Sequence, residues 1–79
     1  DFKELGDTLR HESMHVAQAC NGSDAILDWA TISKYSTNRI LSIVQRYPVD
    51  HQHIEYEAFT AAYVMSNTQV TKIIKDYCF

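Results

Sequence analysis

Apolar residues recur along this chain at spacings of three and four positions, which is the periodicity of one face of an α-helix. Glycine and proline, the residues that most often interrupt helices, occur only twice and once in 79 residues. The pattern predicts an all-α fold in which residues 1–79 form a single domain, a compact bundle of about five short helices. The predicted helices cover residues 2–20, 25–34, 36–47, 51–66 and a last segment around 70–77.

The first predicted helix is the longest of the five. Four of its apolar residues lie near one stripe, which we expect to face the core: Leu5, Leu9, Val16 and Ala19. Asn21-Gly22 follows and should end the helix, because glycine readily adopts the left-handed conformation of a C-terminal cap.

Side chains that can accept a hydrogen bond from a first helical turn precede the later helices. They are Ser23 and Asp24 before the second helix, Ser36 and Thr37 before the third, and Asp50 before the fourth. The third helix should end near Tyr47, since a residue that precedes proline is biased away from helical angles. Asn67-Thr68 is expected to separate the fourth helix from the last.

Residues 11–15 read His-Glu-Ser-Met-His, the H-E-x-x-H pattern, within the first predicted helix. Positions i and i+4 share a helix face, so the imidazoles of His11 and His15 can bind one metal ion. Glu12 is rotated by about 100° from His11, from where it can reach a water molecule at the metal and act as general base. The alternative is two surface histidines on an ordinary helix, with Glu12 solvated or paired with Arg10.

A catalytic zinc site usually takes three protein ligands. Four candidates for the third ligand lie near the start of the fourth predicted helix: His51, His53, Glu55 and Glu57. Glu55 shares its helix face with apolar residues, so we expect it to point toward the core and the first helix. Glu57 is rotated by about 200° onto a more polar face, which favours a solvated or supporting carboxylate. Whether Glu57 replaces Glu55 stays open, and the two histidines are expected to be exposed, with one able to line the cleft.

The segments HESMHVAQ (11–18) and EYEAF (55–59) resemble the gluzincin class of zinc metallopeptidases, in particular its compact members, the minigluzincins. The resemblance implies Zn²⁺ bound by His11, His15 and Glu55, with Glu12 as the catalytic base. The two predicted helices that carry these segments are the part covered by the resemblance, about a third of the chain.

The sequence departs from the gluzincin pattern in two places. Gluzincins often have Asp or Asn four residues after the glutamate ligand, bonded to a zinc-binding histidine, whereas this chain has Phe59. The resemblance leaves Gln18 and Glu57 as substitutes. Peptidases of this class also place a β-sheet before the H-E-x-x-H helix, and its edge strand binds substrate. Only ten residues precede His11, which is too few for such a sheet. We therefore expect that the substrate-binding half was lost, that it lies upstream in a longer protein, or that the domain binds metal without cleaving a substrate.

Composition narrows the function classes further. The net charge of −3 gives no basic patch for nucleic acid, and no apolar run is long enough to span a membrane. No signal-peptide pattern is present, so a soluble protein is expected, with the cytoplasm favoured. Cys20 and Cys78 allow one disulfide, but we favour two buried free thiols, because nothing in the sequence indicates an oxidising compartment.

These observations predict a zinc-dependent peptide hydrolase with Zn²⁺ as cofactor and a peptide or protein as substrate. One alternative is a catalytically inactive, zinc-stabilised structural or protein-binding module derived from such a peptidase. The other is a helical interaction protein in which the motif occurs by chance. The sequence leaves the oligomeric state undefined.

Overall fold

The structure is a computed structural model that describes residues 2–35 and 37–79. It confirms the all-α prediction, since the described residues form helices and turns and contain no strand. The α-helices are α1 (Phe2–Cys20), α2 (Trp29–Ile32), α3 (Asn38–Val44), α4 (Gln52–Tyr63) and α5 (Asn67–Cys78), with 3₁₀ turns η1 (Ser33–Tyr35) and η2 (Val49–His51). Among the described residues, no helix is both long enough and apolar enough to cross a membrane.

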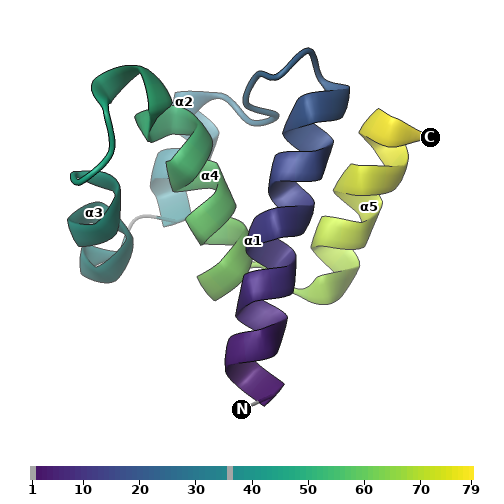
Figure 1. The fold of residues 1–79 in the computed structure, drawn as a ribbon, viewed down its shortest axis with the longest axis horizontal. Helices are drawn as coiled ribbons and strands as arrows, with labels where there is room; N and C mark the ends of the chain where they lie inside the picture. Colours follow the sequence, from purple (N-terminus) through teal and green to yellow (C-terminus); the bar gives the residue numbers. More distant parts are fainter. Residues whose placement is uncertain (1, 36) are drawn as a thin grey trace.

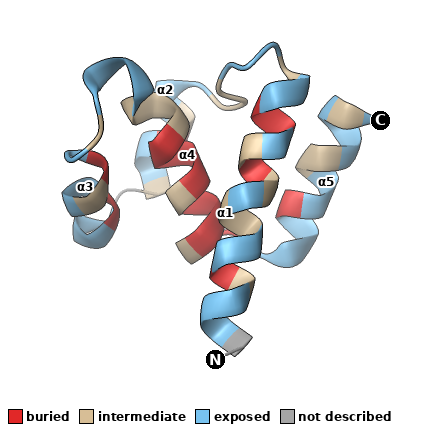
Figure 2. Cartoon of the chain, viewed as in Figure 1, coloured by how far each residue is buried: buried red, intermediate tan, exposed pale blue. Residues whose placement is uncertain are grey.

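Helix α1 lies between α4 and α5 and packs against both (Figure 1). Helices α2 and α3 contact α4. Helix α4 is therefore packed against several neighbours, and seven of its twelve residues are buried. Figure 2 shows the buried segments of α1 and α4 at the centre of the molecule.

The core consists of two groups of apolar side chains. The first joins α1, α4 and α5 and contains Met14, Ala17, Ala58, Ala61, Met65 and Val70. The second joins α4 to α2 and α3 and contains Ile32, Ile40, Val44 and Tyr56. Alanines at the contact between α1 and α4 keep the side chains there short, and the distance between packed helices depends on those side chains. This close pair of helices carries the candidate metal ligands.

The apolar stripe predicted for α1 is not its buried face. Leu5, Leu9, Val16 and Ala19 are all exposed, and the first three have exposed fractions of 57%, 59% and 54%. Among the α1 side chains that the structure describes, the buried ones are Asp7, Met14, Ala17 and Gln18. Polar groups can occupy this face because they find partners there, as buried polar groups must. The prediction was wrong because it counted apolar residues only.

Arg10 fixes α1 to the end of α4. Its guanidinium donates to the carbonyl oxygens of Ala61 (3.2 Å) and Ala62 (2.8 Å) and to Asn67 Oδ1 (2.9 Å). It also forms an ion pair with Asp7 at 2.5 Å. A cation at the last carbonyls of a helix satisfies acceptors that have no partner within the helix. Arg10 is thus a link between helices and does not pair with Glu12.

The second helix is shorter than the prediction of residues 25–34. Asp28 is the N-cap of α2, its side chain accepting a hydrogen bond from the N–H of Thr31 at 2.7 Å. The residues before it are not helical, because the N–H groups of Ile26 and Leu27 donate to the carboxylate of Glu57. Gly22 has a φ of +70°, as the predicted end of α1 requires.

Three further helix starts were predicted with mixed success. Thr37 is the N-cap of α3 as expected, whereas Ser36 lies outside the described residues. Asp50 does not cap α4, because the turn η2 intervenes and α4 begins after His51 without a side-chain cap. Helix α5 begins at Asn67, the first residue of the expected break, since Ser66 and Gln69 form a reciprocal capping box before it.

Cys20 and Cys78 form a disulfide, so the prediction of two free thiols was wrong. The bond joins the last residue of α1 to the last residue of α5, with the Cα atoms 5.2 Å apart. The packing of α5 against α1 brings these ends together although they are 58 positions apart in sequence. A sequence-level argument about compartment could not foresee this proximity.

Replacing both cysteines by serine is expected to lower the free energy of unfolding by about 4 kcal/mol, because a cross-link across so long a loop restricts the unfolded chain. Urea denaturation of the oxidised protein and of the double variant measures the difference. The matched control is a reductant, which should destabilise the wild-type protein and leave the double-serine variant unchanged. Equal stability of the two proteins would contradict the prediction.

Candidate metal centre

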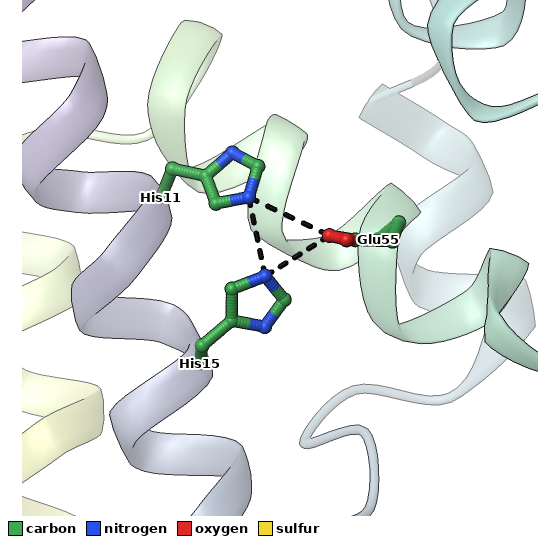
Figure 3. A group of neighbouring side chains, drawn as sticks. All are labelled: His11, His15 and Glu55. Carbon is green, nitrogen blue, oxygen red and sulfur yellow. Dashed lines mark hydrogen bonds and ion pairs between the residues drawn. The ribbon is translucent and has the colours of Figure 1, made fainter. Parts of the chain in front are cut away.

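Three ligand-type side chains converge at the contact between α1 and α4. Nε2 of His15 lies 3.0 Å from Oε1 of Glu55 and 3.1 Å from Nε2 of His11. Nε2 of His11 lies 3.5 Å from the same Glu55 oxygen. Figure 3 shows the two imidazoles pointing from α1 toward the carboxylate on α4. The structure thus brings together the three predicted ligands, and this group could hold a metal ion.

The local sequence explains the convergence. His11 and His15 are one helical turn apart, so their rings project from the same side of α1. Glu55 stands near the start of α4 and is 9% exposed, which agrees with the predicted orientation of its side chain toward the first helix. Because α1 packs along α4, one oxygen of the carboxylate reaches both rings.

The distances between the three ligand atoms suit a small divalent ion. A tetrahedral ion with bonds of 2.0–2.1 Å places its ligand atoms about 3.3 Å apart, and the distances here are 3.0, 3.1 and 3.5 Å. Two imidazole nitrogens and one carboxylate oxygen match the ligand set of catalytic zinc sites. Three protein ligands also leave a fourth position for water or substrate.

The group also needs a hydrogen-bond donor or a cation at its centre. A neutral imidazole nitrogen without its proton and a carboxylate oxygen are both acceptors, so a proton or a cation must lie among atoms this close. Burial lowers the pKa of His11 below its usual range, and the neighbouring imidazole of His15 adds to the effect, although nearby carboxylates oppose it. The lowered pKa favours the neutral imidazole, which is the form that binds metal.

Glu57 lies outside the group of three side chains and is not solvated. It is 0% exposed and accepts hydrogen bonds from Gln18 Nε2 (3.0 Å) and from the backbone before α2. Gln18 in turn lies 2.8 Å from Nδ1 of His15 through its amide oxygen. The expected polar, outward face of Glu57 was wrong, whereas its alternative role as a supporting carboxylate fits the observed contacts.

Phe59 supports the other histidine without a hydrogen bond. Its ring meets the His11 ring edge to face, with centroids 4.3 Å apart and an interplanar angle of 89°. Phe59 also stacks on Tyr63 at 6.0 Å. The aromatic residue that departs from the gluzincin pattern therefore packs against a candidate ligand and limits how its ring can turn.

Glu12 lies beside the group but is not part of it. It is exposed, and among the described residues it forms no hydrogen bond. It lines a hollow of about 160 Å³ together with His11, Thr8, Phe59 and Tyr63. A second hollow of about 170 Å³ borders His15 and Gln18. Open space thus borders each of the two histidines.

The remaining histidines lie elsewhere. His51 is exposed and close to Asp50. His53 is partly buried, and its Nε2 lies 2.9 Å from the carbonyl oxygen of Leu27, while its ring meets Trp29. Neither belongs to the group of potential metal ligands found among the described residues. The contacts of His53 instead help to hold the segment before α2 against α4.

The sequence model of one protein family, described as Domain of unknown function (DUF8637), matches residues 2–79. The chain belongs to the DUF8637 family. All three candidate ligands and both helices that carry them lie within the matched part of this DUF8637 chain. No curated protein and no solved structure matches the chain.

Proposed function

We propose that this DUF8637 chain is a zinc-dependent peptide hydrolase of the gluzincin type. The observation that supports the proposal best is the convergence of His11, His15 and Glu55 within 3.5 Å of one another. Zinc is favoured over magnesium or calcium because two of the three ligand atoms are imidazole nitrogens, and those ions prefer oxygen.

The proposed reaction also assigns a role to Glu12. When bound, a zinc ion supplies a Lewis acid that polarises a peptide carbonyl and lowers the pKa of water to about 7. Glu12 would accept the proton of the attacking water and pass it to the leaving amine. Its position supports this role, since its carboxylate shares a hollow with His11 and is not engaged by a hydrogen bond to another described residue.

A second candidate function is a zinc-stabilised binding module without catalytic activity. The observation that favours it is that the described residues contain no strand with which an extended peptide could pair. This module would use the same ligands, but Glu12 would have no chemical role. The two candidates therefore differ in what Glu12 does and agree on the metal.

Metal analysis of the purified protein tests what the two candidates share. We expect one zinc ion per chain, retained in Glu12→Gln and lost in Glu55→Gln, because the latter replaces a ligand oxygen that carries charge. Plasma emission spectrometry and calorimetric titration measure the stoichiometry. A protein that takes up no zinc, or takes it up equally well after Glu55→Gln, would rule out both candidates.

A further inference from the structure

The side chains behind His15 form a chain of hydrogen bonds that is separate from the three ligand atoms. Nδ1 of His15 lies 2.8 Å from Oε1 of Gln18. Nε2 of Gln18 lies 3.0 Å from the carbonyl oxygen of Ile54 and 3.0 Å from Oε1 of Glu57. Glu57 also accepts from two backbone N–H groups before α2, at 2.8 and 2.6 Å. The chain thus connects α1, α4 and the segment before α2.

The far end of this chain fixes the direction of every bond in it. Backbone N–H groups can only donate, and both oxygens of Glu57 receive them. A carboxylate and a carbonyl oxygen accept, so Gln18 must turn its NH₂ group toward Glu57 and Ile54. Its oxygen then faces His15, and Nδ1 of His15 must carry the proton.

We propose that Gln18 and Glu57 are positioning residues that set the tautomer of His15. With the proton held on Nδ1, the lone pair of Nε2 is directed to the place where His11 and Glu55 converge. Gln18 is 3% exposed and Glu57 is 0% exposed, so both side chains depend on partners within the protein. The purpose of this arrangement rests on the proposed metal site. Without a cation, a further proton must lie between His15 Nε2 and Glu55 Oε1, which are 3.0 Å apart, whereas the proton on Nδ1 is set by Gln18 in either case.

The two histidines differ in how the position of their imidazole proton is set. Nδ1 of His11 forms no hydrogen bond within the described part of the chain, and its ring is held by Phe59. His15 is therefore the ligand whose protonation is fixed by the fold. The same bonds make the segment before α2 part of the support, since its backbone holds the Glu57 carboxylate in place.

The substitution Glu57→Gln tests the proposal through an effect at a distance. The oxygen of the new side-chain amide would keep accepting from the backbone, and its NH₂ group would face Gln18. Reversal of the Gln18 amide would satisfy this NH₂ group but would place the Gln18 oxygen against the Ile54 carbonyl oxygen. The orientation of Gln18 would therefore no longer be fixed, and part of the imidazole proton population would move from Nδ1 to Nε2. We expect this change in the ¹⁵N–¹H spectrum of the imidazole in metal-free protein at about pH 8.5, well above the ordinary histidine pKa. Zinc affinity should fall about 10–100-fold.

The double variant Gln18→Glu/Glu57→Gln should restore the arrangement. The carboxylate at position 18 would accept from His15 Nδ1–H and from the amide at position 57 but would leave the Ile54 carbonyl oxygen without its donor, so the proton should return to Nδ1 with only part of the zinc affinity. The matched control is Thr60→Val, because Thr60 is another fully buried polar residue of α4 and its hydroxyl donates to the Tyr56 carbonyl (2.8 Å), away from His15. It should change neither the tautomer nor the affinity.

A wild-type His15 without a proton on Nδ1 would overturn the proposal, and so would a Glu57→Gln variant with an unchanged tautomer and unchanged affinity. If Glu57→Gln does not fold, the wild-type spectrum and the Gln18→Met variant test the proposal. Methionine removes the amide, so the imidazole proton of His15 should no longer prefer Nδ1. A wild-type Nδ1 proton in a protein that binds no zinc would support the positioning role and refute the proposed function, so the two failures can be told apart.

Discussion

Replacing Glu12 by glutamine is expected to lower the rate of peptide hydrolysis by about 10²–10⁴-fold, the usual contribution of a general acid or base. Glutamine has nearly the same shape but cannot accept the proton of the attacking water. Because Glu12 is exposed and contributes no ligand atom to the group of His11, His15 and Glu55, zinc stoichiometry and stability should be unchanged. Cleavage of a fluorogenic peptide library by zinc-loaded protein measures the effect.

The control for this experiment is Asp76→Asn. Asp76 is an exposed carboxylate on α5 that pairs with Lys72, so its loss should not affect hydrolysis. If the zinc-loaded wild-type protein cleaves no peptide of the library, the inactive module becomes the better account. Activity that survives in Glu12→Gln would show that another group is the base.

Removing zinc by chelation should lower the melting temperature by roughly 15–30 °C. Free zinc at a thousand times its dissociation constant stabilises the folded state by about 4 kcal/mol, and each kcal/mol corresponds to roughly 4–8 °C in a domain of this size. The physical reason is that the ligands lie on α1 and α4 and converge only in the folded chain. Differential scanning calorimetry with and without a chelator gives the shift.

The matched variant for chelation is Glu55→Gln, which should melt at one temperature whether or not the chelator is present. His51→Gln is the control that keeps the response, since His51 is exposed and lies outside the ligand group. An unchanged melting temperature of the wild-type protein would mean that the three side chains do not hold a tightly bound ion.

The convergence of the ligands could be predicted because it depends on local periodicity. The spacing of His11 and His15 places both rings on one side of α1, and the phase of α4 orients Glu55 toward that helix. Both arguments use only the geometry of a single helix. The fold class followed from the same periodicity and from the scarcity of glycine and proline.

The burial of Glu57 could not be predicted in this way. A phase argument assumes that a helix has one buried face and one solvated face, whereas α4 is covered on more than one side and its buried residues run from Glu55 to Ala58 without interruption. For α1 the error was the opposite, because three of its large apolar residues face solvent while Asp7 and Gln18 are buried. In both helices the deciding contacts come from other parts of the chain.

The covalent link between Cys20 and Cys78 also determines what a protease can do to this molecule. A single cut anywhere in residues 21–77 would leave one covalently joined particle, because the bond reconnects the pieces. A break in the exposed segment 22–24 would place His11 and His15 on one fragment and Glu55 on the other, yet neither could diffuse away. Nicked protein should therefore migrate as two bands only after reduction.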